Sequence, residues 1–284
     1  MSCAPRAAGA AVNGQGTAPD AGVLDVAVLT DVGTGREHNE DSCGLVREGE
    51  RCAVLVVADG VSSSAGGEVA SAMAVETVLQ VFQERAPEES AVRLYRSVQE
   101  ANIGIYDRSV VVPELRGMAT TLTAAVVDDG RLTAVHVGDS RLYLWRDGAL
   151  TQLTKDHTAA AEKVRMGLLG KERARSHPDR CVLTRSVGRE LIVSRDRLSQ
   201  PLRQGDALLL CSDGLYNVLE DDELAALVAG KTAAEACQAL VAGANARGTP
   251  DNLTACVLRM LGPVAPRPES PGLGQRLRSL IRRA

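Results

Sequence analysis

Aromatic residues are scarce in this sequence, at 2% of 284 residues, with one tryptophan, one phenylalanine and four tyrosines. The hydrophobic fraction is nevertheless 45%, an ordinary value for a soluble globular protein. The core must therefore be built mainly from leucine, valine, alanine and isoleucine. A chain of this length can bury such a core as one large domain or as two smaller ones.

Long apolar runs and paired cysteines are also missing. No run approaches the roughly 18 apolar residues of a membrane-spanning helix, and the N-terminus lacks the basic flank and apolar segment of a secretion signal. The seven cysteines are odd in number, widely spaced and contain no C-x-x-C pair. We therefore expect reduced, mostly buried thiols in a cytoplasmic protein, and no disulphide framework.

The sequence has no excess of basic charge, and it also lacks several familiar catalytic motifs. The net charge of -4 and the isoelectric point near 5.7 argue against a general nucleic-acid binder. The sequence has no C-x-x-x-x-x-R loop, no phosphate-binding G-x-x-x-x-G-K-[ST] loop, no H-E-x-x-H and no G-x-S-x-G. Of the four scattered histidines, we expect His136 in the core and the others on the surface or in loops, namely His38, His157 and His177.

Composition divides the chain into three parts. Residues 1–21 are small and polar and predict a disordered leader, whereas residues 22–261 contain no linker or repeat and predict one domain. Residues 262–284 combine a Pro-rich linker with a short tail, 273–284, that has the pattern of a basic amphipathic helix. Two alternatives remain for this tail. It either contacts a membrane or a partner protein, or it has no such contact and is docked on its own domain or disordered.

Short Val-, Leu- and Ala-rich runs alternate with longer helical ones. The predicted strands are 23–30, 53–58, 119–127, 132–137, 141–146, 207–211 and 253–259. Apolar periodicity predicts two helix pairs, at 67–85 with 88–108 and at 221–229 with 232–246. Asp-Gly turns at 129–130 and 147–148 predict hairpins within one antiparallel meander. The fold class expected from this order is a layered α/β (α+β) sandwich.

Acidic residues recur at the ends of the predicted strands. Asp59 and Asp213 each follow a strand directly and precede glycine, Asp139 follows another strand, and Asp251 precedes the last one. A single such pair is most simply a turn, but five acidic positions, including the Asn-Glu-Asp at 39–41, favour a shared site. Clustered carboxylates repel one another unless cations neutralise them, and oxygen ligands select Mg²⁺ or Mn²⁺. Two such ions commonly serve phosphate-ester hydrolysis.

Eight sequence pieces, taken in order, resemble the PPM family of metal-dependent serine/threonine protein phosphatases (PP2C-like), in its bacterial branch. The resemblance implies a fold of two central antiparallel β-sheets flanked by helix pairs, and hydrolysis of phosphoserine and phosphothreonine by a metal-bridging hydroxide. The pieces span nearly the whole predicted domain: GTGREHNEDS (33–42), VVADG (56–60), GGEVAS (66–71), ATTLTAAVV (119–127), VHVGDSRLYLWRDGALTQLTKDHT (135–158), LTRSVG (183–188), GDALLLCSDGLYNVLEDDEL (205–224) and GTPDNLTACVL (248–258).

The resemblance also implies metal ligands. Asp59 would bridge two Mn²⁺ or Mg²⁺ ions, and the Gly60 carbonyl would bind one of them. Asp213 and Asp251 would complete the shell of the first ion, and Glu40 would serve the second, directly or through water. In bacterial members a third, weaker ion is bound at the position that corresponds here to Asp139.

Three further residues have implied roles around these ligands. Arg36 matches the arginine that clamps the substrate phosphate, and a guanidinium fork suits phosphate oxygens. Asp41 would lie behind the ligands and support them, and Asn252 would steady the loop around Asp251. Catalysis would therefore depend chiefly on Arg36, Asp59 and Asp213.

Two departures from the family pattern affect the expected mechanism. Val61 stands where eukaryotic members have a histidine proposed as general acid, so the proton donor for the leaving group is left unassigned. The segment 158–180 corresponds to the family's flap and is shorter and more basic than usual. Its basic residues either favour acidic phosphopeptides or form a solvated face.

Partners follow from the same resemblance. The expected substrates are phosphorylated proteins, including a Ser/Thr kinase and its targets, and the protein is expected to act as a monomer in the cytoplasm. Two alternative functions remain at this point: a weakly active or inactive phosphoprotein-binding pseudophosphatase, and a dedicated phosphatase of a partner-switching regulator. A complete set of aspartates argues against the inactive form.

Overall fold

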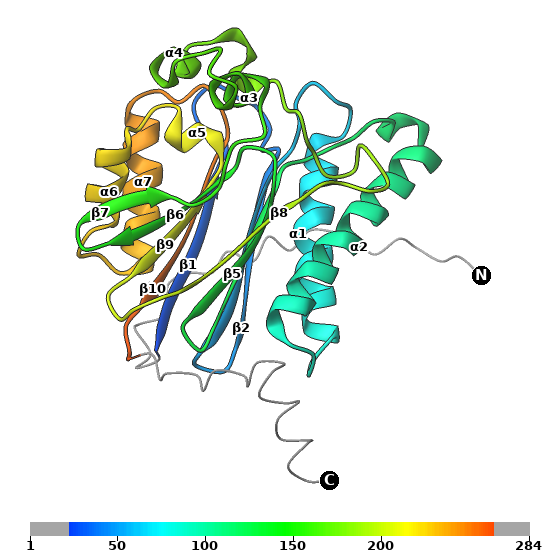
Figure 1. Cartoon of the computed structure of the whole chain (residues 1–284). Coiled ribbons are helices and arrows are strands. Elements are labelled where there is room, and N and C mark those ends of the chain that lie inside the picture. The colour runs from blue at the N-terminus through cyan, green and yellow to red at the C-terminus, as the bar shows by residue number, and fades with distance from the viewer. Residues whose placement is uncertain (1–22, 264–284) are drawn as a thin grey trace, which may run out of the picture.

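Two antiparallel sheets, each of five strands, lie face to face at the centre of the protein (Figure 1). The computed structural model describes residues 23–263, so the predicted leader and the tail 273–284 lie outside the described residues. The first sheet has the order β1–β10–β9–β6–β7, formed by Leu24–Asp31, Leu253–Met260, Ala207–Cys211, Arg141–Arg146 and Ala149–Gln152. The second has the order β2–β3–β4–β5–β8, formed by Asp41–Glu48, Cys52–Asp59, Leu122–Asp128, Arg131–Val137 and Asp196–Pro201.

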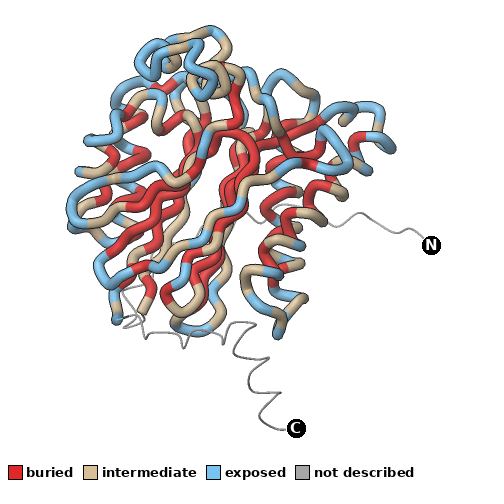
Figure 2. Tube along the Cα trace, in the orientation of Figure 1, coloured by how far each residue is buried: buried red, intermediate tan, exposed pale blue. Residues whose placement is uncertain are grey.

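The core is split into layers by the two-residue alternation of the central strands. In β3, Leu55 and Val57 face the other sheet and pack in one buried cluster with Leu208 and Leu210 of β9. The intervening side chains of β3, such as Val56, face outward and pack under helices. These central strands are buried over almost their whole length (Figure 2). Small aliphatic side chains therefore fill the space that aromatic residues fill in many cores.

A helix pair covers the outer face of each sheet, as predicted. Gly67–Glu84 (α1) and Ser90–Val111 (α2) pack on the second sheet, and Asp221–Val228 (α6) and Ala233–Ala246 (α7) on the first (Figure 1). A capping box fixes the start of α7. The Glu235 backbone N–H donates a hydrogen bond to the Thr232 hydroxyl, and the Thr232 backbone N–H donates one to the Glu235 carboxylate. The predicted helix boundaries are thus close to the observed ones.

The predicted single meander is wrong in one respect. The two hairpins exist, with the predicted turns at Asp129 and Asp147 in left-handed conformation, at φ 45° and 51°. However, β4 and β5 lie in the second sheet whereas β6 and β7 lie in the first. The chain crosses between the sheets at Gly138. Its φ of 104° is a conformation that favours glycine, and a Cβ added at this position would lie 2.6 Å from the Thr121 side chain. Hairpin signals are local and do not report which sheet a hairpin joins.

Strands β2 and β8 were not predicted, because their residues are half-exposed and weakly patterned. Between β7 and β8 lies the flap segment, residues 158–180. It contains α3 (Ala159–Arg165), α4 (Lys171–Arg175) and most of η2 (Pro178–Cys181), at one end of the sandwich (Figure 1). Two shorter elements are η1 (Pro113–Leu115) and α5 (Asp213–Tyr216).

The thiol and membrane predictions can be checked for residues 23–263. The cysteines in that range are free thiols, half-buried at Cys43, exposed at Cys181 and buried at Cys52, Cys211, Cys237 and Cys256. No helix in the described range is long and apolar enough to cross a membrane.

Candidate metal and phosphate site

Acidic side chains from separate segments gather at the end of the sandwich that carries the flap. The carboxyl of Asp59 interacts electrostatically with those of Asp41, Asp139, Asp213 and Asp251. Asp41 and Asp251 lie far apart in the sequence, so it is the fold that brings these carboxyls together. The structure therefore joins into one group the aspartates that the sequence predicted as metal ligands.

Strand pairing explains this convergence. Asp41, the first residue of β2, pairs directly with Asp59, the last residue of β3. Asp213 follows β9 and Asp251 precedes β10, and these two strands are antiparallel neighbours, so the end of one lies beside the start of the other. Asp139 lies at the crossover between the sheets. The edge that results carries a carboxylate from each sheet and from the crossover.

Asp41 is buried behind this edge, where its carboxylate accepts hydrogen bonds from Ser212 Oγ at 2.6 Å and Thr254 Oγ1 at 2.8 Å. Removal from water raises its pKa to about 7, despite the two hydroxyl donors. The pKa of Asp59 is raised well above its usual range, first by loss of hydration and then by the neighbouring carboxylates. Raised pKa values in neighbouring carboxyls indicate that the negative charge at this edge exceeds the positive charge that the chain places there.

The pKa values of Asp213 and Asp139 are also raised. Loss of hydration and the carboxylate of Asp251 raise the pKa of Asp213 to about 6, although Asn217 donates a hydrogen bond to it at 3.0 Å. Asp139 is 7% exposed, and its pKa is raised strongly by the same loss of hydration. The nearby Arg141 forms its ion pair with Asp156 and not with Asp139.

Arg36 lies at the rim of this acidic group, on the loop between β1 and β2. Its Nη2 is 3.0 Å from a carboxylate oxygen of Asp251, and its Nη1 donates to Ser62 Oγ at 3.3 Å. The guanidinium is about one-third exposed, and nearby carboxylates including Glu40 raise its pKa. The predicted phosphate-binding arginine and a predicted metal ligand thus face each other directly.

Glu40 and Gly60 are held together by backbone contacts. The Gly60 N–H donates to the Glu40 carbonyl at 3.1 Å, and an added Cβ on Gly60 would lie 2.4 Å from the Gly67 carbonyl oxygen. Asn252 holds the same loop: its amide donates to the carbonyls of Val32 and His38, at 2.8 and 2.9 Å, and accepts from Glu40 N at 2.8 Å. Its side chain therefore anchors mainly the Glu40 loop, whereas the predicted role was to steady Asp251.

Buried hydroxyl groups and His157 support the crossover, and sequence patterns did not reveal them. Thr121 Oγ1 accepts from Asp59 N at 2.9 Å and contacts Ser140 Oγ at 2.6 Å. His157 lies in a loop, one of the two positions expected for it, but it is only 1% exposed, and its Nδ1 accepts a hydrogen bond from Gly138 N at 3.1 Å. Its burial follows from the folding of the flap base over it. His136 is buried, as predicted.

Comparison with known proteins gives the family of this site. The family model described as Protein phosphatase 2C matches residues 34–255. The serine/threonine phosphatase stp of Listeria monocytogenes serotype 4b is 37% identical over 230 residues, which cover 79% of this chain and 91% of that protein. The chain belongs to the protein phosphatase 2C family. The predicted family and enzyme class are therefore confirmed.

Solved structures of protein phosphatases of this kind have the same fold. A crystal structure of the Mycobacterium tuberculosis serine/threonine phosphatase PstP/Ppp is 36% identical, with a TM-score of 0.76 over 84% of this chain and 100% of that one. A crystal structure of the PstP catalytic domain in complex with two manganese ions is 34% identical, with a TM-score of 0.75 over 84% of this chain and 99% of that one. The predicted two-sheet sandwich with flanking helix pairs is confirmed.

The donor set in this phosphatase fits hard divalent ions. Its side chains are carboxylates, its candidate backbone ligand is the Gly60 carbonyl, and Mn²⁺ and Mg²⁺ favour oxygen ligands. Within residues 23–263, no three Asp, Glu, His or Cys side chains are gathered closely enough to enclose an ion by themselves. Water and backbone oxygen would therefore complete the coordination, as is usual for Mg²⁺ and chemically similar ions.

Proposed function

We propose that this chain removes phosphate from phosphoserine and phosphothreonine in proteins, with two Mn²⁺ or Mg²⁺ ions at its acidic edge. Asp59 would bridge the ions, Asp213 and Asp251 would hold the first, and Glu40 and the Gly60 carbonyl would contribute to the second. Asp139 would hold a third ion more weakly. The observation that supports this most directly is the group of carboxylates whose pKa values are raised by burial and mutual repulsion.

Such a group is costly to fold without a compensating cation, because buried like charges destabilise one another. A phosphatase gains from this arrangement, since divalent ions neutralise the carboxylates and also attract phosphate. A binding protein without activity would not need the full set, and none of the predicted acidic ligands is replaced here. This favours the enzyme over the pseudophosphatase.

When bound, the ions supply a water nucleophile at neutral pH and stabilise charge on the phosphoryl oxygens. The chain's own residues then position the substrate. Arg36 is exposed at the rim and carries a planar fork of donors, so it binds the phosphate as the phosphoprotein arrives. Asn217 keeps the Asp213 carboxylate in place by donating to one of its oxygens. Asp41 supports the edge from behind through Ser212 and Thr254.

Protonation of the leaving serine or threonine oxygen has no donor at position 61. Val61 is apolar, and its backbone N–H is bonded to the Ala119 carbonyl at 3.0 Å. The nearby hydroxyl of Ser64 is also engaged, donating to the Val61 carbonyl at 2.7 Å. We propose that water delivers this proton.

The finer features of this function are part of the same proposal. The substrates would include a Ser/Thr kinase and its phosphorylated targets, and the enzyme would work as a cytoplasmic monomer. The domain would comprise residues 22–261. A dedicated role in a partner-switching system would use the same chemistry on one phosphoserine protein.

The test is hydrolysis of p-nitrophenyl phosphate and of a phosphothreonine peptide by the full chain, after treatment with chelator and after addition of Mn²⁺ or Mg²⁺. We expect activity to vanish with chelator and to return with metal. Activity that persists in chelator, or that never appears with either ion, would contradict the proposed function.

Arg36→Ala is expected to raise KM for p-nitrophenyl phosphate about 10- to 100-fold, the usual value of a charge-assisted hydrogen-bonded contact, with a smaller change in kcat. The reason is that a guanidinium binds the phosphate similarly in the ground and transition states. Arg51→Ala is a matched control, because Arg51 forms an exposed ion pair with Asp129 at the end of β3 that lies away from Asp59. Equal KM values for Arg36→Ala and wild type would rule out phosphate binding by this arginine.

A further inference from the structure

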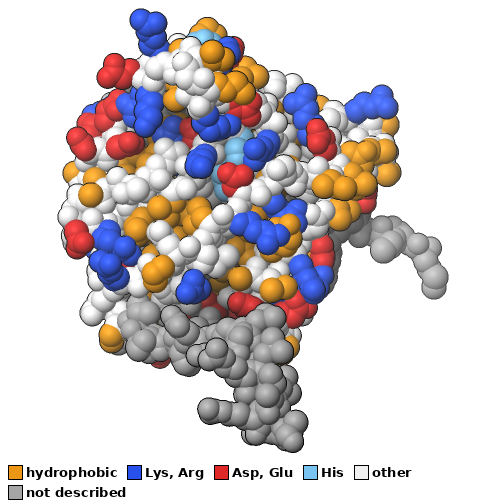
Figure 3. Space-filling view, viewed as in Figure 1, with side chains coloured by type: hydrophobic (Ala, Val, Ile, Leu, Met, Phe, Trp, Pro, Cys, Tyr) orange, Lys and Arg blue, Asp and Glu red, His pale blue; other side chains and the backbone are white. Residues whose placement is uncertain are grey.

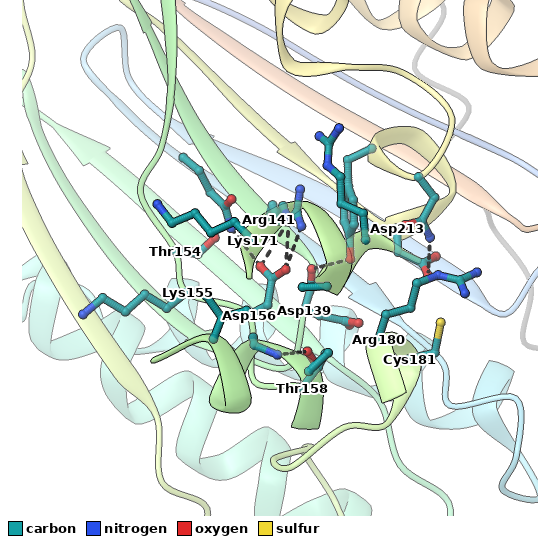
Figure 4. Close-up of a pocket in the computed structure, with 18 of the residues that line it drawn as sticks. Asp139, Arg141, Thr154, Lys155, Asp156, Thr158, Lys171, Arg180, Cys181 and Asp213 are labelled. Atoms are coloured by element: carbon teal, nitrogen blue, oxygen red, sulfur yellow. Dashed lines mark hydrogen bonds and ion pairs between the residues drawn. The ribbon is translucent and has the colours of Figure 1, made fainter. Parts of the chain in front are cut away.

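A pocket of about 600 Å³ opens beside the acidic edge, under the flap. Asp139 and Asp213 form part of its wall, so it is continuous with the proposed metal site. Its other walls come from the flap helices α3 and α4, from the β7–α3 segment and from the residues after α5. Figure 4 shows Arg180 extending beside Asp213 at one end, with Lys155 and Lys171 at the other.

Most charged side chains in this pocket are already paired. The Arg141 guanidinium binds Asp156 with contacts of 2.7 to 3.2 Å and stacks on the Tyr216 ring at 3.6 Å. Arg175 pairs with Glu220. Asp139 and Asp213 are the residues proposed to hold metal ions, so their charge would also be compensated in the active enzyme.

Two lysines are left over, and Arg180 adds a third cation that acts electrostatically on Asp213. Within the described part of the chain, Lys155, Lys171 and Arg180 take part in no hydrogen bond or ion pair through their side chains. Among the acidic residues of the pocket, Asp221 alone remains without a compensating group, at the N-terminus of α6. On the face shown in Figure 3, basic side chains are intermixed with acidic ones on the flap and below it. The pocket therefore carries net positive charge once its internal pairs are made, and a concave wall strengthens that potential.

We propose that this pocket binds a second anionic group of the phosphoprotein substrate, an acidic side chain or another phosphate on the segment that carries the scissile phosphate. The inference rests on the proposed phosphatase function. A peptide whose phosphate lies at the proposed metal site must leave that site along some wall. This pocket begins at Asp139 and Asp213 and offers the cations Lys155 and Lys171 along that path. Lys155 and Lys171 are the residues that select for such substrates.

Lysine suits this task because its ammonium group is a flexible point charge that accepts either a carboxylate or a phosphate. The contact would be partly exposed, so its contribution is modest and sensitive to salt. It would act on recognition of the peptide and leave chemistry at the metal site unchanged. Substrates without a protein segment, such as p-nitrophenyl phosphate, would not use it.

The experiment compares kcat/KM of the Mn²⁺-loaded full chain on three phosphothreonine peptides: one with neutral flanks, one with acidic flanks and one with a second phosphate. We expect about a tenfold preference for both anionic peptides over the neutral one at low salt. The double variant Lys155→Gln, Lys171→Gln should reduce that preference to near one. Its turnover of p-nitrophenyl phosphate should equal that of wild type.

Arg173→Gln is the matched control, since Arg173 belongs to the same helix α4 but does not line the pocket. This variant should keep the full preference. Any of three results would overturn the proposal. These are a wild type without preference for the anionic peptides, a double variant that keeps that preference, and an Arg173→Gln variant that loses as much of the preference as the double variant does. A preference for one anionic peptide alone identifies the source of the anion. Lack of p-nitrophenyl phosphate turnover in wild type would instead contradict the phosphatase function.

Discussion

Asp213→Asn is expected to lower turnover of p-nitrophenyl phosphate about a thousandfold, equivalent to ~4 kcal/mol of lost transition-state stabilisation. The substitution keeps the shape of the side chain and one oxygen that can still accept from Asn217. It removes the negative charge that a divalent ion needs at this position. The loss would therefore come from metal binding and not from misfolding.

Folding measurements separate these two causes. The Asp213 carboxylate is destabilised by loss of hydration and by Asp251 in the metal-free protein. An uncharged amide relieves that repulsion, so in chelator the variant should melt at the same temperature as wild type or at a higher one. Added Mn²⁺ should raise the melting temperature of wild type much more than that of the variant, because ligand binding stabilises only the state that binds it.

Asp147→Asn provides the control for this prediction. Asp147 lies in the left-handed turn of the β6–β7 hairpin, where asparagine is equally suitable. Activity and the Mn²⁺-induced stabilisation should both match wild type. Retained activity in Asp213→Asn, or a variant that is unfolded in chelator, would contradict a ligand role for Asp213.

Metal-free protein is expected to lose stability as the pH rises from about 6.5 to 8.5, by about 0.8 kcal/mol for Asp41 alone. The folded-state pKa of Asp41 is raised from 3.8 to about 7, so the folded chain binds this proton more tightly than the unfolded chain. Its contribution is fully present below the ordinary pKa and is lost as the pH rises through about 7. Asp59 and Asp139 act in the same direction.

Buried histidines set the lower limit of this pH window. The pKa of His136 is lowered from 6.5 to about 4 by burial, and that of His157 is lowered for the same reason. They make stability increase with pH below about 6.5, where the unfolded chain binds more protons. As the pH rises further, the imidazoles of the unfolded chain lose their protons too, so the opposing effect of the histidines fades and the aspartates determine the slope.

Urea unfolding in chelator at several pH values across this window would measure the effect. Asp41→Asn should flatten the slope, since an amide oxygen still accepts from Ser212 but does not titrate. Saturating Mn²⁺ should abolish or reverse the loss, because metal binding requires ionised carboxylates. Stability that is constant or increasing with pH in chelator would contradict the raised pKa values on which this prediction rests.

Local sequence patterns predicted much of the fold but not its assembly. The hairpin turns at Asp129 and Asp147 and the capped helix at Thr232 are encoded within a few residues, and their positions are close to those predicted. Strand β8 is half-exposed and joins the sheet through pairing with β5, a contact that no local pattern reports. The crossover at Gly138 likewise depends on which sheet each hairpin completes.

The sequence by itself determined the family and the acidic residues, because metal chemistry requires particular side chains in particular motifs that can be read in one dimension. Tertiary structure decided what surrounds them. The pairing of Asp41 with Asp59, the contact of Arg36 with Asp251 and the burial of His157 arise from segments distant in sequence. Charge and hydration at a site depend on every neighbour in space, so only the folded chain fixes the pKa values of these carboxylates and the unpaired cations of the flap pocket.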